Sequence, residues 1–187
     1  MDYLTILPRL LMKTGQVALL SVLTALCIGL QLTPRPPNVE FTSLISFTVG
    51  VAFGCWFGAI LGASVMFVNG FLSPYGLAGL LILFQAAGMG LIGLVGGVYS
   101  KTVAEDKAKR MPVEVAILGA FLTLTYDVIT NVGYALQFSL FTNSVIVSFI
   151  GVLVAGSVFM VIHVASNTAL FVASIPMVKG IQKLLRR

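Results

Sequence analysis

Residues 41–72 read FTSLISFTVGVAFGCWFGAILGASVMFVNGFL, and this stretch contains no charged side chain. One helix crosses the hydrocarbon core of a bilayer with about 20 residues, so the stretch is too long for one ordinary span and short for two. Its middle contains Gly50, Gly54, Gly58 and Trp56. We therefore expect a break near residues 57–60 and two helices, at 42–57 and 59–72.

The rest of the chain has the composition of a membrane protein. Of its 187 residues, 58% are hydrophobic and 9% are charged, and the mean hydropathy is +1.06. No Asp, Glu, Lys or Arg occurs in residues 41–100, and in residues 115–178 the only such residue is Asp127, with His163 as the only histidine. Such stretches belong in lipid or in a protein interior. The sequence therefore predicts an all-α integral membrane protein.

Six membrane spans account for this pattern. We expect them at about 16–32, 42–57, 59–72, 77–100, 113–140 and 144–178. With six spans the basic pair near residues 9–13, the cluster at 101–110 and the C-terminal KGIQKLLRR all fall on one side, as the positive-inside bias requires. With five spans the middle cluster would change sides. We predict one transmembrane domain over residues 1–187, with both termini cytoplasmic and no separate soluble domain.

The span expected at 113–140 carries a polar stripe. A rotation of about 100° per residue brings polar side chains into one sector. They are Thr123, Asp127, Thr130, Asn131 and Tyr134, with Gln137 at the edge. A charge at mid-membrane costs roughly 2.5 to 3.5 kcal/mol on insertion scales, so Asp127 should face protein or water and have a partner. Either the stripe lines a ligand pocket or ion path, or it is an interhelical polar lock worth about 1 kcal/mol.

The span at 144–178 supplies a candidate partner for that carboxylate. His163 and Asn167 lie one turn apart and point the same way. His163 falls near the depth of Asp127, so two interpretations stay open: a hydrogen bond between them that lines or closes the base of a pocket, or an interior histidine that bonds elsewhere. Because His163 is the only histidine, the sequence does not predict a metal site.

Further candidates lie toward the predicted outer surface. Gln85 precedes the glycine-rich part of the fourth span, where it could reach a ligand instead of only supporting helix packing. The outer loops carry Arg35, Asn38, Glu40, Asn69 and Tyr75. No P-loop, H-E-x-x-H, nucleophile elbow or paired-carboxylate site occurs, so we expect no enzymatic activity, no catalytic residues and no cofactor.

Several of these features together resemble the S component, the substrate-binding membrane subunit, of energy-coupling factor (ECF) vitamin transporters. The resemblance covers nearly the whole chain: six spans, an outer first loop reading RPPNVEF, the passage GVAFGCWFGAILGASVMFVNGF, and YDVITN on the fifth span. It implies high-affinity binding of a vitamin or related micronutrient in a pocket open to the outside. It also implies transport as part of an ABC importer in a prokaryotic cell membrane, with a transmembrane coupling protein and two cytoplasmic ATPases.

The resemblance also assigns roles to residues of this chain. It implies that Arg35, Asn38 and Glu40 form a gate or rim, that Asn69 and Tyr75 sit at the lid formed by the third loop, and that Asn131, Tyr134 and Gln137 line the pocket wall above Asp127. A small-residue face on the first span would dock the coupling protein. Its positions here are Ser21, Ala25 and Gly29, with serine in place of the first alanine of the family's A-x-x-x-A pattern.

Two other functions remain open. The chain could be a non-transporting scaffold subunit of a cell-envelope assembly, in which Asp127 only packs. It could also be a stand-alone proton-coupled carrier that uses Asp127 with His163. The lack of a second acid or base within the spans and of a detectable inverted repeat weighs against the carrier.

Overall fold

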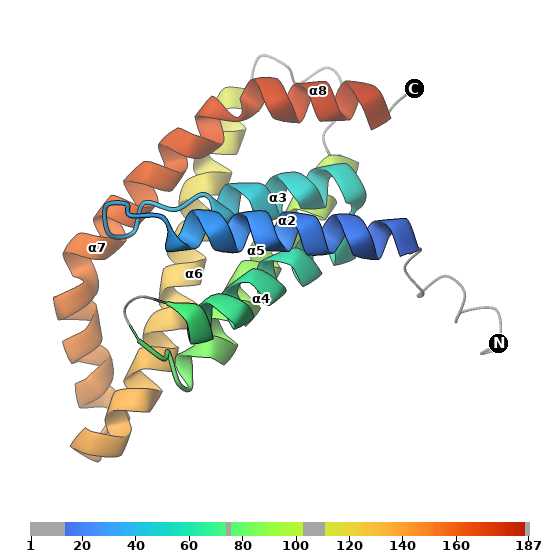
Figure 1. The fold of residues 1–187 in the computed structure, drawn as a ribbon. Coiled ribbons are helices and arrows are strands. Elements are labelled where there is room, and N and C mark those ends of the chain that lie inside the picture. The colour runs from blue at the N-terminus through green and yellow to red at the C-terminus, as the bar shows by residue number, and fades with distance from the viewer. Residues whose placement is uncertain (1–13, 74–75, 103–110, 186–187) are drawn as a thin grey trace, which may run out of the picture.

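The computed structural model of the chain describes residues 14–73, 76–102 and 111–185 (Figure 1). The regular elements in these ranges are helices: α2 (Thr14–Leu32), α3 (Thr42–Phe53), α4 (Cys55–Leu72), α5 (Leu81–Thr102), α6 (Met111–Thr142), α7 (Val145–Ala173) and α8 (Ile175–Leu185). The predicted all-α class is therefore confirmed for the part of the chain that the structure describes.

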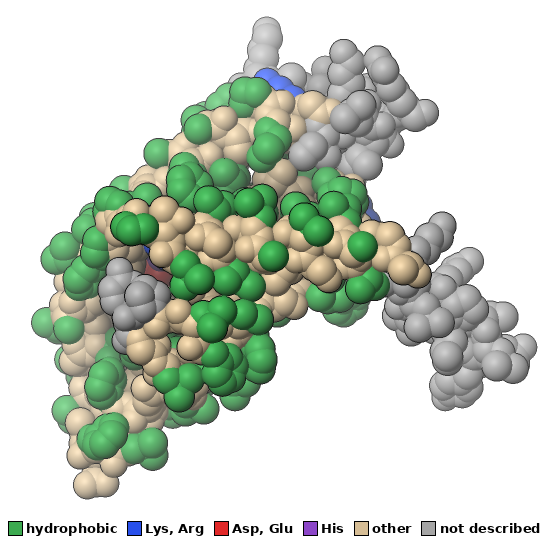
Figure 2. Space-filling view, in the orientation of Figure 1, with side chains coloured by type: hydrophobic (Ala, Val, Ile, Leu, Met, Phe, Trp, Pro, Cys, Tyr) green, Lys and Arg blue, Asp and Glu red, His purple; other side chains and the backbone are tan. Residues whose placement is uncertain are grey.

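Five of these helices, α2, α4, α5, α6 and α7, are long and apolar enough to cross a membrane. Large hydrophobic side chains are exposed along them, including Val22, Phe67, Leu83, Phe121 and Val154. Figure 2 shows the consequence on one face, where hydrophobic and uncharged groups make up almost all of the coloured surface. A continuous apolar exterior suits contact with lipid tails and not with water. The chain thus has the helices and the surface of a helical membrane protein.

The uncharged stretch of residues 41–72 forms two helices, as expected, but they part at Gly54 and not near residues 57–60. Gly54 has φ +101°, a backbone conformation that glycine adopts at little steric cost, and its N–H donates to the Gly50 carbonyl at 2.9 Å. Helix α3 is 12 residues long, about 18 Å at 1.5 Å per residue, against a hydrocarbon core of about 30 Å. The count of six full spans and the cytoplasmic termini stay predictions.

The last predicted span, 144–178, is divided in the structure. Helix α7 ends at Ala173 after 29 residues, and α8 begins at Ile175 and turns across the end of the molecule (Figure 1). The Ser174 hydroxyl donates to the Phe171 carbonyl at 2.7 Å, and Pro176 has no N–H with which to continue the α7 hydrogen-bond series. These two local features end the helix before residue 178.

The helices pack as two groups. Helices α3 and α4 pack on α5, with α2 across α4, and α6 pairs along its length with α7 (Figure 1). Contacts between α5 and α6 join the groups. Phe47, Met89, Tyr126 and Phe171 belong to a buried cluster that both groups share. The groups diverge toward the α6–α7 turn, and the candidate site lies between them.

Close packing of α4 on α5 depends on glycine at position 93. A Cβ added there would lie 2.1 Å from the Gly58 carbonyl oxygen, whereas one added at Gly151 meets nothing within 4 Å. We expect Gly93→Ala to lower the free energy of unfolding by about 1 to 3 kcal/mol, because the helix backbones must move apart. Thermal unfolding in detergent measures the effect, with Gly151→Ala as the matched control. Equal melting temperatures for the two variants would contradict the prediction.

Candidate functional site

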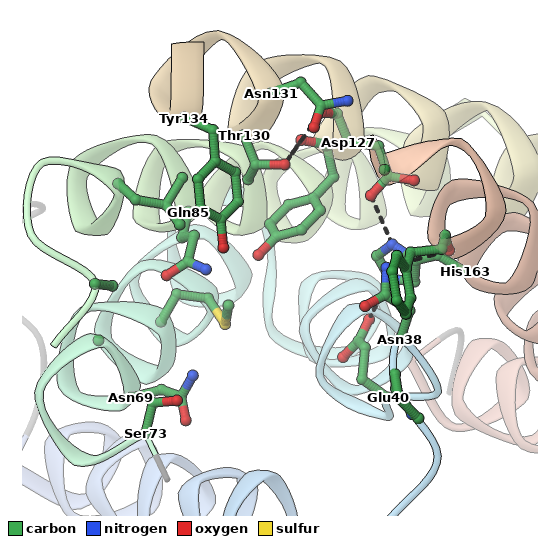
Figure 3. A pocket seen from close by; sticks show the side chains of 18 of the residues that line it. Asn38, Glu40, Asn69, Ser73, Gln85, Asp127, Thr130, Asn131, Tyr134 and His163 are labelled. Atoms are coloured by element: carbon green, nitrogen blue, oxygen red, sulfur yellow. Dashed lines mark hydrogen bonds and ion pairs between the residues drawn. The ribbon is translucent and has the colours of Figure 1, made fainter. Parts of the chain in front are cut away.

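A cavity of about 760 Å³ lies between the α6–α7 pair and the remaining helices. Helix α6 lines it with Tyr126, Asp127, Thr130, Asn131, Tyr134, Gln137 and Phe138, and α7 with Val152, Ala155, Gly156, Phe159, Met160 and His163. The opposite wall includes Met66, Asn69, Ser73, Leu81, Gln85 and Met89, and the α2–α3 connection adds Arg35, Pro37, Asn38 and Glu40. Figure 3 shows polar side chains from these walls pointing into a shared space.

The polar stripe on α6 forms one wall of the cavity. Asp127, Asn131 and Tyr134 line it, as helical spacing predicts. The innermost member of the predicted stripe does not: Thr123 is fully buried, and its hydroxyl donates to the Gly119 carbonyl at 2.7 Å. At the other end, the rings of Tyr134 and Phe138 stack with centroids 6.2 Å apart. The wall therefore runs from a carboxylate at one end to an aromatic pair at the other.

Asp127 has the candidate partner that the sequence indicates. Its Oδ1 lies 2.7 Å from Nδ1 of His163, and both side chains are buried. The His163 ring also packs edge-on against Tyr126, with centroids 5.8 Å apart. Of the two interpretations, the hydrogen bond between α6 and α7 is the one that the structure contains. The stripe thus contributes both an interhelical contact and a cavity wall.

Glu40 is a second buried carboxylate in the same place. The resemblance places it in a rim, but it is only 6% exposed, and its Oε1 lies 3.6 Å from Nε2 of His163, within ion-pair distance. Asn167 donates to the same oxygen from Nδ2 at 3.2 Å. The histidine therefore lies between two carboxylates, one from α6 and one from the α2–α3 connection (Figure 3).

The N-terminus of α3 holds Glu40 in position. The backbone N–H of Ser43 donates to Oε2 at 3.0 Å, and the Ser43 hydroxyl donates to Oε1. Burial raises the pKa of the Glu40 carboxyl, whereas the contacts with His163 and Ser43 lower it, so the pKa falls from 4.5 to about 2. Glu40 is therefore ionised at neutral pH. A carboxylate just before the first turn of a helix also interacts favourably with the positive end of the helix dipole.

The α2–α3 connection is attached to α7 by a second set of contacts. Asn38 has φ +58°; its Nδ2 donates to the Phe159 carbonyl at 3.2 Å, and its own carbonyl accepts from the Ser166 hydroxyl at 3.2 Å. Arg35 donates from one terminal nitrogen to the Val39 carbonyl at 2.7 Å and from the other to Gln31 Oε1. The connection therefore closes one side of the cavity in a defined conformation.

The remaining predicted residues divide into three groups. Asn69, Gln85 and Gln137 line the cavity. Asn167 does not line it, but it supports the cluster through Glu40. Tyr75 lies outside the described residues. Among side chains that line the cavity, the sequence gives no signal for Gln31, Met66, Ser73, Tyr126 or Met160, because they come from separate helices whose packing brings them together.

The predicted docking face on α2 lies away from this cavity. Ser21, Ala25 and Gly29 are all exposed, and a Cβ added at Gly29 meets nothing within 4 Å. Of the residues of α2, only Cys27 and Gln31 are buried. The face is therefore free to contact lipid or another protein.

The cavity has the chemistry of a binding site for an organic molecule. Among the described residues no group of three or more His, Cys, Asp and Glu side chains has the arrangement needed to hold a metal ion. Buried amides, tyrosines and carboxylates within a mostly apolar wall are typical of small-molecule sites. We compared the chain with protein-family models, curated proteins and solved structures, and none of them matches it.

Proposed function

We propose that the chain is the high-affinity substrate-binding subunit, the S component, of an ECF-type ABC importer for a vitamin or related micronutrient. The observation that carries the proposal is the cavity of about 760 Å³, which is bounded by apolar helices and lined by convergent polar groups. Ligand pockets typically have volumes of about 300 to 1,000 Å³ and few polar groups in an apolar wall. The resemblance in the first loop and in YDVITN supports the same function.

The cavity suits a flat nitrogen heterocycle. Tyr134 and Phe138 offer ring faces for stacking, and Asn131, Gln85 and Asn69 offer amides for hydrogen bonds. The α2–α3 connection, held to α7 through Asn38, closes over one side. Asp127 and Glu40 form the charged end of the site, with His163 between them.

Binding measurements test this proposal. We expect one vitamin of a panel to raise the melting temperature of the purified protein and to bind with submicromolar affinity. Asn131→Ala and Tyr134→Ala should each weaken binding about tenfold or more, because each removes a side chain that lines the cavity and can contact the ligand. Val132→Ala is the matched control, because Val132 is 38% exposed on α6 and does not line the cavity. Unchanged affinity in both cavity variants would rule out this site.

Transport requires partners in this proposal. The exposed face of Ser21, Ala25 and Gly29 is the surface that would dock a membrane coupling protein, which in turn binds two cytoplasmic ATPases. Co-purification from native membranes distinguishes the candidates. Recovery of ATPase subunits supports the importer, whereas recovery of envelope-assembly enzymes without ligand binding supports a scaffold.

One observation favours a second candidate, a proton-coupled carrier. Glu40 adds a second buried carboxylate to Asp127 and His163, so three titratable groups lie within one cluster. Uptake of the identified vitamin into liposomes that contain only this protein would establish the carrier. Uptake that requires the coupling protein and ATP would establish the importer.

A further inference from the structure

Only one of the two carboxylate oxygens of Asp127 has a hydrogen-bond partner among the described residues. Its Oδ1 bonds to His163, but its Oδ2 is buried and has no hydrogen-bond partner among the described residues. A carboxylate has lone pairs for about four hydrogen bonds, and a buried anionic oxygen without a donor is costly. Asp127 lines the cavity, so a bound molecule is the natural source of the missing donor.

A second acceptor without a partner lies on another helix that lines the cavity. Oε1 of Gln85, on α5, is buried and lacks a hydrogen-bond partner among the described residues. Gln85 also lines the cavity, and Figure 3 shows its amide on the side opposite His163. Two walls of the cavity thus present oxygen acceptors that require donors.

The positive groups around the cavity, by contrast, each make contacts with oxygen atoms of the protein. Arg35 directs both terminal nitrogens to protein oxygens, those of Val39 and Gln31. Nδ1 of His163 bonds to Asp127 Oδ1, and its Nε2 lies 3.6 Å from Glu40 Oε1, within ion-pair distance but without a hydrogen bond among the described residues. Even with a protonated histidine, this trio carries a net charge of −1. Among the described lining residues there is no lysine. A carboxylate or phosphate on the cargo would therefore meet an acidic cluster at this end of the cavity, whereas Arg35, whose two bonded acceptors are uncharged, lies in the α2–α3 connection.

We propose, on the basis of the proposed function, that the cargo carries a positively charged nitrogen group with N–H donors, such as an amidinium or a protonated amine. That group binds the free oxygen of Asp127, and a neighbouring donor on the cargo binds Gln85. The body of the cargo lies toward the Tyr134 and Phe138 rings. Cargo that is anionic at neutral pH is disfavoured at this end of the cavity, because its charge repels the acidic cluster.

Probes of different charge test this inference on the full-length protein in detergent. The cationic probes are benzylamine and benzamidine, the neutral probe is riboflavin, and the anionic probes are biotin and nicotinate. We expect at least one cationic probe to bind about 100-fold more tightly than either anionic probe. An anionic or neutral probe that binds most tightly overturns the inference and leaves the proposed function intact. If no probe binds and no ATPase subunits co-purify, the inference and the proposed function both fail.

Substitutions then identify the residues responsible. Asp127→Asn keeps an oxygen that can accept from His163 but removes the charge, and we expect it to weaken binding of the cationic probe about 30-fold. Gln85→Leu should weaken it about tenfold, and this variant leaves the buried charge cluster untouched if Asp127→Asn fails to fold. Glu114→Gln is the control, an acidic residue in the first turn of α6 that does not line the cavity. Unchanged cation affinity in a folded Asp127→Asn or in Gln85→Leu overturns the inference.

Discussion

Replacing His163 with leucine should destabilise the protein more than any other single change in the site. His163 is 4% exposed and lies 2.7 Å from Asp127 Oδ1 and 3.6 Å from Glu40 Oε1. Without the ring, the two carboxylates remain buried without a cation between them. Removing one partner of a buried ionic group typically costs about 3 to 5 kcal/mol. We expect the free energy of unfolding to fall by about that amount, as measured by thermal or denaturant unfolding in detergent.

The loss of stability in His163→Leu should depend on the charges of Asp127 and Glu40. In the triple variant with Glu40→Gln, Asp127→Asn and His163→Leu, no buried charge remains, and we expect most of the lost stability to return. Ser157→Leu is the control on the same helix, because Ser157 is exposed and bonds only to the Val154 carbonyl one turn away. A triple variant as unstable as His163→Leu would show that packing of the imidazole ring, and not its charge, stabilises the site.

The contact between Asp127 and His163 could be predicted from sequence, as one of two interpretations, because helical spacing constrains both partners. Two polar residues in long apolar spans must find partners at similar depth, and few candidates exist in this chain. The polar stripe of α6 follows from the same periodicity. Predicting these two features requires only the periodicity of the α-helix and the free-energy cost of a buried charge.

The role of Glu40 could not be predicted in this way. It contacts His163 and Asn167, which lie more than 120 positions away in the chain, through a connection whose path sequence periodicity does not define. A charged residue beside prolines in a predicted loop is most often solvated. Only the packing of this connection on α7 reveals that the carboxylate is buried.

The exact position of a helix boundary could not be predicted from the sequence either. The sequence identifies the uncharged stretch of residues 41–72 and indicates that it is divided into two helices. It does not indicate which of three glycines in its middle is the break. Gly50 and Gly58 serve close packing against α5, since a Cβ at either would lie within 2.6 Å of Gly93 O. Gly54 alone of the three adopts positive φ. The choice among them depends on a neighbouring helix and not on the local sequence.

Filling the cavity should abolish ligand binding without unfolding the protein. Gly156 lines the cavity from α7, and the nearest atom to a Cβ built there is Asn131 Oδ1 at 4.0 Å. The indole ring of Gly156→Trp can therefore extend into the cavity that a cargo would occupy. We expect affinity for the identified ligand to fall more than about 100-fold, because the aromatic side chain and the ligand cannot be present together.

The control for this variant lies less than two turns away on the same helix. Gly151 is exposed, and a Cβ there meets nothing within 4 Å, so Gly151→Trp adds the same ring on the outer surface of α7. We expect it to bind ligand with normal affinity, and we expect both variants to unfold close to the wild-type temperature. Calorimetric titration and thermal unfolding check both expectations. If Gly156→Trp binds normally while folded, the ligand does not occupy this cavity, whatever the chain transports.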